Sequence, residues 1–211
     1  MKASENVVYV IDDDLAVRKA LSKSLIILGY SVQSYESAEI FLESFVPARP
    51  SCLVLDVRMP GMSGMELQKE LIARQIPMRI IFISGHGDIP MSVNAIKLGA
   101  IDFLEKPYQV EQLLTLVAEA LELDSIALSK DRKYELIRAS YDRLTAREIE
   151  VMELLVAGAA NTSNKIIAKK LEISHRTVDD HRTSIMAKMQ AKSITDLVIM
   201  SNICGDYGNL L

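Results

Sequence analysis

The sequence has few cysteines and no long hydrophobic run, and both features restrict what the chain can be. Cys52 and Cys204 are the only cysteines among 211 residues, too few for a disulfide framework or a cysteine metal cluster. No apolar stretch approaches the roughly 20 residues that span a bilayer, and the first six residues are too polar for a secretory signal. We therefore expect a cytoplasmic protein with no membrane partner.

Charge is distributed unevenly along the chain, although its net charge is only −4. Residues 1–124 carry a net charge of −6, residues 125–192 carry +4 and residues 193–211 carry −2. An acidic first part followed by a basic segment fits an anion-handling domain joined to a nucleic-acid-binding domain.

Short apolar runs alternate with amphipathic stretches over residues 7–124. The runs, which we expect to be strands, are Val7–Ile11, Ser31–Tyr35, Cys52–Leu55, Ile80–Ile83 and Ile101–Leu104. The stretches, which we expect to be helices, are Leu15–Leu28, Ala38–Phe45, Gly64–Arg74, Pro90–Leu98 and Val110–Leu123. Five such repeats predict an α/β fold with a doubly wound, five-stranded parallel sheet and helices on both faces.

The rest of the chain has a helical pattern only. Residues 125–143 contain no Gly or Pro and are rich in charge, so we interpret them as a helical or partly helical linker that continues from the last receiver helix. A small all-α domain is expected over residues 144–211. Its helices are predicted at about 146–157, 163–171, 175–189 and 194–201. Thr145, Ser174 and Ser193 are the expected caps of the first, third and fourth of them.

Aspartate, serine and lysine side chains that could take part in a reaction lie where the predicted strands end. In a parallel sheet these strand ends meet at one edge. Each has an ordinary explanation when taken alone, because aspartates often cap helices and lysine is common in loops. Their joint occurrence at successive strand ends instead predicts a phosphoryl-acceptor site. The residues are Asp12, Asp13, Asp14, Asp56, Ser84 and Lys106.

Each group has a physical role in such a site. A carboxylate accepts a phosphoryl group readily only when the charge on the phosphoryl oxygens is neutralised. Mg²⁺ does this with a few carboxylate ligands and water, so we expect Asp13 and Asp56 to bind it directly and Asp12 through water. Lys106 supplies a positive charge, and the hydroxyl of Ser84 can donate a hydrogen bond to a phosphoryl oxygen.

Residues 5–124 resemble a two-component response-regulator receiver with a flavodoxin-like fold. The resemblance rests on the order of these strand-end residues and on the stretch Leu53–Gly64. The resemblance implies that a sensor histidine kinase phosphorylates Asp56 and that the main-chain carbonyl of Arg58 is a further Mg²⁺ ligand. It also implies a switch made of Ser84 and Phe103, in which Phe103 acts through packing because it lacks a hydroxyl. The Lys106–Pro107 peptide is commonly cis in that family.

The resemblance further implies that phosphorylation reorders the surface of the fourth helix, the fifth strand and the fifth helix. Lys97 and Asp102 carry opposite charges on this surface, and the nearby Val93 would supply apolar area to an interface. Our hypothesis is that Lys97 and Asp102 pair across a two-fold homodimer that forms on phosphorylation.

The C-terminal segment is similar to the helix-turn-helix of LuxR/NarL/FixJ-type regulators, and most of all to the FixJ branch. The similarity rests on Leu144–Val151, Asn164–Leu171, Ile173–Val178 and Ile185–Met189. It implies that dimers bind inverted half-sites in double-stranded DNA through the helix that Ser174 caps. Candidate DNA contacts are Lys165, Arg176, Thr177, Arg182, Lys188 and Lys192.

Two features depart from that family's pattern. Asp179 and Asp180 stand at positions that should face the major groove, where a carboxylate repels phosphates unless it accepts from a cytosine amine. The connection over residues 158–164 is about three residues longer than usual.

Two other functions fit part of the sequence. An aspartyl phosphatase needs a carboxylate two residues after its nucleophile, where this chain has Arg58. We therefore expect no enzyme beyond a receiver that promotes its own phosphorylation and dephosphorylation. A C-terminal unit that binds a protein instead of DNA stays open, because residues 144–211 are nearly neutral.

Overall fold

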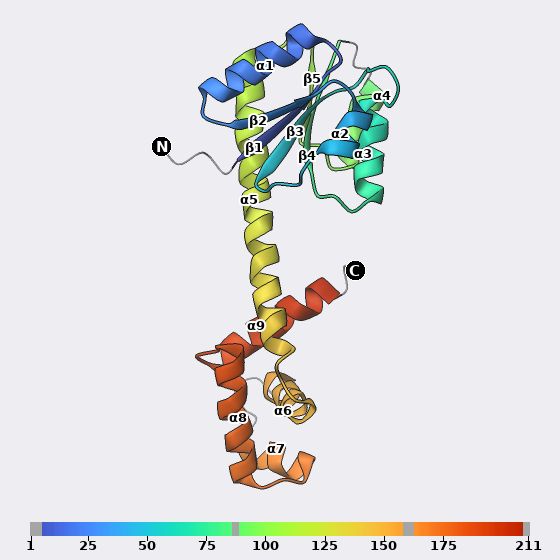
Figure 1. The fold of residues 1–211 in the computed structure, drawn as a ribbon. Coiled ribbons are helices and arrows are strands. Elements are labelled where there is room, and N and C mark those ends of the chain that lie inside the picture. Colours follow the sequence, from blue (N-terminus) through green and yellow to red (C-terminus); the bar gives the residue numbers. More distant parts are fainter. Residues whose placement is uncertain (1–5, 86–88, 158–162, 209–211) are drawn as a thin grey trace. The chain divides into compact units, whose positions relative to one another are not determined.

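The computed structural model describes residues 6–85, 89–157 and 163–208. The chain divides into two compact units, Met1–Leu128 and Ser129–Leu211, which are taken separately below (Figure 1). Residues 158–162, which make up most of the long connection predicted above, lie outside the described residues. No helix in the described ranges is long and apolar enough to cross a membrane.

The first unit is built on a five-stranded parallel sheet, as the sequence predicts. The strands stand in the order β2-β1-β3-β4-β5, and every neighbouring pair is parallel. They are β1 (Val7–Ile11), β2 (Ser31–Tyr35), β3 (Ser51–Asp56), β4 (Arg79–Ser84) and β5 (Asp102–Glu105).

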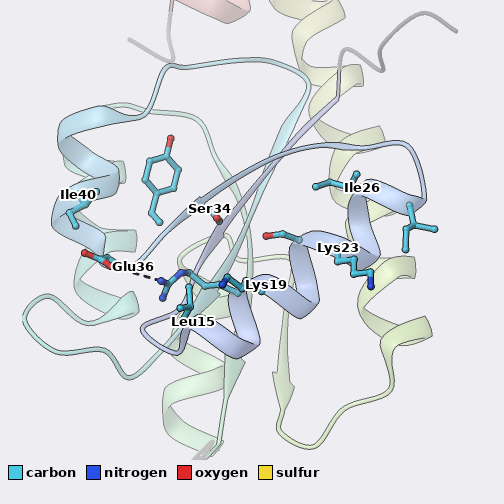
Figure 2. A pocket seen from close by; sticks show the side chains of 11 residues that line it. Leu15, Lys19, Lys23, Ile26, Ser34, Glu36 and Ile40 are labelled. Carbon is cyan, nitrogen blue, oxygen red and sulfur yellow. Dashed lines mark ion pairs between the residues drawn. The ribbon is translucent and has the colours of Figure 1, made fainter.

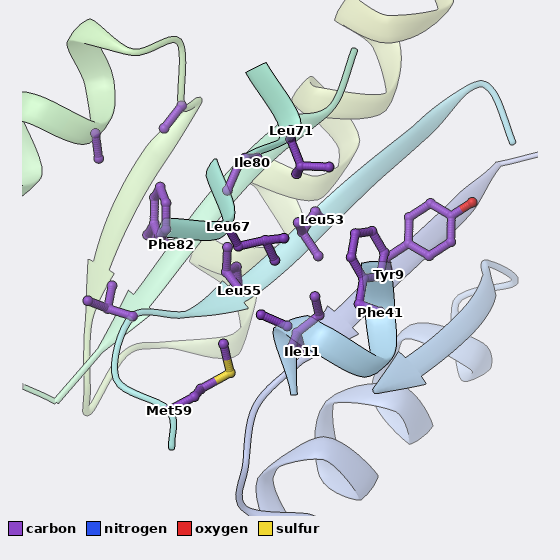
Figure 3. Packing of buried hydrophobic residues seen from close by; sticks show 14 of the residues in the cluster. Tyr9, Ile11, Phe41, Leu53, Leu55, Met59, Leu67, Leu71, Ile80 and Phe82 are labelled. Carbon is purple, nitrogen blue, oxygen red and sulfur yellow. The ribbon is translucent and has the colours of Figure 1, made fainter. Parts of the chain in front are cut away.

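Helices cover both faces of this sheet, with α1 and α5 on one face and α2, α3 and α4 on the other (Figure 1). Tyr9 and Leu53 pack on the α2–α3 side (Figure 3), while Val8 and Val54 pack on the α1–α5 side. Burial on both faces explains why the central strands are continuously apolar. The helices are α1 (Leu15–Ile27), α2 (Ala38–Ser44), α3 (Gly64–Ala73), α4 (Ile89–Lys97) and α5 (Val110–Tyr141).

The second unit is helical throughout its described part, and its predicted caps are present. Ser174 accepts a hydrogen bond from the Thr177 N–H at 3.0 Å, and Ser193 accepts one from the Asp196 N–H at 3.1 Å. Val178, Ile185 and Met189 are buried in the core, as their spacing predicts. The helices are α6 (Ala146–Ala157), α7 (Asn164–Leu171), α8 (His175–Met189) and α9 (Ile194–Gly208).

One helix continues as predicted, and another is longer than predicted. α5 runs without a break from Val110 to Tyr141, through most of the linker that was expected to continue it. α9 runs to Gly208 instead of ending near Ser201, because Met200, Ile203 and Cys204 pack against the core and extend its apolar face.

Candidate functional site

Three aspartates from two strand ends come together at the carboxyl edge of the sheet. One carboxylate oxygen from each of Asp12, Asp13 and Asp56 lies within 4.8 Å of the other two. Asp12 and Asp56 are only 2% and 8% exposed, whereas Asp13 faces solvent. Hard oxygen ligands that are partly open to water suit Mg²⁺, which keeps several of its water ligands.

Lys106 joins two of these carboxylates. Its Nζ atom lies 2.9 Å from Asp12 Oδ2 and 2.8 Å from Asp56 Oδ2. Burial alone would lower the pKa of Lys106, but the hydrogen bonds to Asp56 and Asp12 outweigh it and the pKa is raised. Burial raises the pKa of Asp12, and the bond from Lys106 opposes that shift. Lys106 therefore stays charged between the two carboxylates.

The third consecutive aspartate, Asp14, has another task. Its side chain caps α1 by accepting from the N–H groups of Ala16 and Val17. The backbone N–H of Asp14 donates to Asp12 Oδ1 at 2.9 Å, which orients the Asp12 carboxylate.

The loop after β3 is held close to Asp56. The Arg58 N–H donates to Asp56 Oδ1 at 3.2 Å. A Cβ atom at Gly64 would overlap the Asp56 carbonyl oxygen, so only glycine allows α3 to begin here. On the far side of the loop, Glu39 Oε1 accepts from the Met62 N–H at 2.6 Å. Glu39 was not predicted as part of this site, because its partner lies 23 residues away and no local pattern marks the contact.

The predicted switch residues lie on neighbouring strands. Ser84 is fully buried at the end of β4, next to Glu105 in the register of β5. Phe103 is half-buried, and its ring centroid is 6.1 Å from that of Phe82. The Lys106–Pro107 peptide is cis.

The surface of α4 presents apolar side chains to solvent. Ile89 is 78% exposed, Val93 46% and Ile96 43%. Lys97, at the end of this helix, is exposed, whereas Asp102 is half-buried and accepts from the Phe103 N–H at 2.8 Å.

The predicted DNA contacts lie on α7, on α8 and just after α8. Lys165, Arg176, Asp179, Asp180 and Lys192 are exposed, and Thr177 and Arg182 are half-buried. The Thr177 hydroxyl is 2.8 Å from the Ser174 hydroxyl, so this side chain belongs to the cap of α8.

Lys188 differs from the other candidates because it has an internal partner. Its Nζ atom donates to Glu148 Oε2 at 2.7 Å and to Oε1 at 2.9 Å. Glu148 also accepts from the Ser184 hydroxyl and from Thr145. Burial alone would raise the pKa of Glu148, but these bonds outweigh it and lower the pKa to about 2. Lys188 therefore secures α8 to α6, and its role as a DNA contact stays a prediction.

Asn164 connects the two helices of the turn motif. Its amide donates to Asp179 and accepts from Arg182. One side chain from the start of α7 therefore orients both Asp179 and Arg182, which the sequence pattern of α8 alone does not show. Asp179 and Arg182 are three residues apart on α8, so their side chains lie on the same face of that helix.

Together, the fold, the carboxylate cluster and the helix-turn-helix are those of a receiver domain joined to a DNA-binding domain. A family model described as response regulator receiver domain matches residues 8–118. A second, described as bacterial regulatory proteins, luxR family, matches residues 142–201. The chain belongs to the two-component response regulators that join a receiver to a LuxR-family DNA-binding domain.

Individual relatives match over nearly the whole chain. The transcriptional regulatory protein FixJ of Bradyrhizobium diazoefficiens is 41% identical over 94% of this chain and 95% of its own length. The response regulator protein TodT of Pseudomonas putida is 44% identical over 94% of this chain and 86% of its own.

Solved structures agree with this assignment. The response regulator StyR is 40% identical, with a TM-score of 0.85 over 93% of this chain and 98% of that one. Full-length FixJ from B. japonicum is 40% identical, with a TM-score of 0.56 over 94% of this chain and 97% of that one.

Proposed function

We propose that this protein is a transcription regulator in which Mg²⁺-dependent phosphorylation of Asp56 by a sensor histidine kinase controls dimerisation and DNA binding. The observation that carries the proposal is the Asp12–Asp13–Asp56 cluster with Lys106 bridging it. Within a receiver, such a cluster suits attack by an Asp56 oxygen on a phosphohistidine, with the imidazole as leaving group.

In this proposal each residue has a defined part. Asp13, Asp56 and the Arg58 carbonyl would hold Mg²⁺, and Asp12 would hold it through water. Bound there, Mg²⁺ would supply positive charge for the phosphoryl oxygens. Lys106 moves its bonds from Asp56 to a phosphoryl oxygen, and Ser84 donates to another. The hydrogen bond from Ser84 would draw the loop after β4 toward the phosphoryl group, and this movement would change how Phe103 packs.

We propose the domain limits 1–124 for the receiver, 125–143 for the linker and 144–211 for the DNA-binding domain, in a cytoplasmic protein. Asp124 supports the first limit. It is 2% exposed and accepts from Arg49 Nη2 and from the Ser51 N–H, each at 2.9 Å. This bond network secures the receiver part of α5 to the start of β3.

Sedimentation velocity with Mg²⁺ tests the function directly. We expect a small-molecule phosphoryl donor to convert the wild type from monomer to dimer and to leave the Asp56→Ala variant monomeric, because that variant lacks the acceptor. Mass spectrometry of the intact chain verifies phosphorylation. A phosphorylated wild type that stays monomeric would overturn the proposed dimerisation, and an unphosphorylated one would overturn the acceptor.

The proposed dimer uses the exposed apolar side of α4, with Lys97 of each copy facing Asp102 of the other. We expect Lys97→Glu to weaken donor-dependent dimerisation about tenfold, because like charges then meet across the two-fold axis. Lys97→Glu/Asp102→Lys should restore it. Unchanged dimerisation in Lys97→Glu would show that this pair is not at the interface.

DNA binding is proposed for the exposed Lys165, Arg176 and Lys192 of the second unit, with the half-buried Arg182 and Thr177. Asp179 and Asp180 would face base edges, where a carboxylate accepts from a cytosine amine. Because Asn164 donates to Asp179, this carboxylate is fixed in direction. A protein-binding output remains the second candidate, favoured by the two exposed aspartates.

Salt dependence separates the two outputs. For the phosphorylated protein on double-stranded DNA, we expect the binding constant to fall steeply with salt. Arg176→Ala and Lys192→Ala should each lower the slope of log K against log salt by about 1. Lys69→Ala, at an exposed receiver position, is the matched control and should leave the slope unchanged. A salt-independent interaction would favour the protein-binding output.

A further inference from the structure

Arg18, on α1, is a buried arginine outside the residues assigned above. Only 9% of the residue is exposed, and its Nη1 atom donates to the main-chain carbonyl of Asp12 at 2.6 Å. A buried guanidinium needs strong compensating contacts. Its ion-pair partner, Glu36, is 3.9 Å away and 65% exposed, so that pair contributes little. The Asp12 carbonyl is therefore the closer and better shielded of these two partners.

The pair of Arg18 and Glu36 lies in a groove of about 590 Å³ beside α1, where the dashed line to Glu36 marks their contact (Figure 2). The carbonyl bond is made by Nη1 to Asp12, which does not line this groove. The guanidinium thus spans from the wall of the groove to the backbone of the acidic cluster.

That backbone position matters for the metal site. Asp12 is held at three atoms: its carbonyl oxygen by Arg18, Oδ1 by the Asp14 N–H and Oδ2 by Lys106. The Asp12 carbonyl belongs to the peptide that leads into Asp13. Fixing the plane of this peptide fixes the direction in which the exposed Asp13 leaves the strand.

We propose that Arg18 is a positioning residue of the metal site, which holds the Asp12–Asp13 peptide so that both carboxylates face the cation. The inference rests on the Mg²⁺ site of the proposed function. Outer contacts that orient metal ligands typically change affinity by about 10- to 100-fold when they are removed.

The direction in which Mg²⁺ affinity changes when Arg18 is replaced distinguishes a positioning role from a purely electrostatic one. Arg18 places a positive charge near the cluster, so on Coulomb's law alone its removal would tighten Mg²⁺ binding. If Arg18 positions the ligands, its removal weakens binding. A purely structural role would lower stability without metal and leave the dissociation constant for Mg²⁺ unchanged.

The experiment measures Mg²⁺ affinity of the full chain by the rise of the melting temperature with Mg²⁺ concentration and by calorimetric titration. We expect Arg18→Met to weaken Mg²⁺ binding about tenfold. Arg18→Lys keeps the charge and one donor, and should stay within about threefold of wild type. Glu36→Gln alters only the outer contact and is the matched control, expected to bind as wild type does.

Equal or tighter Mg²⁺ binding by Arg18→Met would overturn the inference while leaving the metal site in place. If Arg18→Met does not fold, Arg18→Gln, which also removes the charge, carries the same comparison. A wild type whose melting temperature and titration do not respond to Mg²⁺ would instead overturn the metal site itself, and this inference with it.

Discussion

Lys106→Met is expected to slow phosphorylation of Asp56 by a small-molecule donor about 100-fold, the usual effect of removing one preorganised charge from a transition state. Lys106 Nζ already lies 2.8 Å from Asp56 Oδ2, so it is in place for the oxygens of an incoming phosphoryl group. Intact-mass spectrometry over time measures the rate, with Mg²⁺ saturating.

The same substitution should not weaken Mg²⁺ binding. Lys106 is bonded to Asp12 and Asp56, so its removal leaves more negative charge for a cation, and we expect equal or tighter affinity. Lys106→Arg retains the charge and is the matched control, with a smaller loss of rate. A Lys106→Met rate within threefold of wild type would show that Lys106 is a structural counter-ion only.

Glu148→Ala is expected to destabilise the C-terminal unit by about 3 kcal/mol, because it leaves Lys188 without its anion and removes the α6 cap. Glu148 is 4% exposed and receives bonds from Lys188, Ser184 and Thr145. Calorimetry of the full chain should show a lower transition for this unit and an unchanged one for the receiver.

Two further variants test whether the ion pair carries the effect. Glu148→Gln keeps the shape but leaves Lys188 unpaired. Glu148→Gln/Lys188→Met removes both charges and should recover part of the loss, since a half-buried lysine without its anion costs more than no charge at this position. If the double variant is as unstable as the sum of the single ones, the two side chains do not act as a pair.

The pair also predicts a pH dependence. The folded pKa of Glu148 is lowered from 4.5 to about 2, so the unfolded chain binds more protons between these values. The stabilisation is fully present above about pH 4.5 and is lost as the pH falls through 2. At about 1.36 kcal/mol per pKa unit, this stabilisation amounts to roughly 3 kcal/mol. Glu148→Gln should flatten stability over this window, and an unchanged profile would contradict the assignment.

Much of the fold follows from the sequence, because the signals involved are local. Apolar runs of strand length, separated by amphipathic stretches, suffice for a parallel sheet with helices on both faces. The Ser174 and Ser193 caps fix where α8 and α9 begin, since a cap bonds a backbone N–H two or three residues away. Asp56 and Lys106 could be found because the ends of parallel strands meet at one edge.

The sequence alone determined the fold class, the residue types of the acceptor site and the start of each C-terminal helix. Only the tertiary structure decided which charges are partners. Lys188 pairs with Glu148 across 40 positions, Asn164 reaches Arg182, and Arg18 turns back to the Asp12 carbonyl. A lysine on a helix surface has the same local pattern whether it meets a phosphate or a buried carboxylate, so only the packing of distant elements distinguishes them.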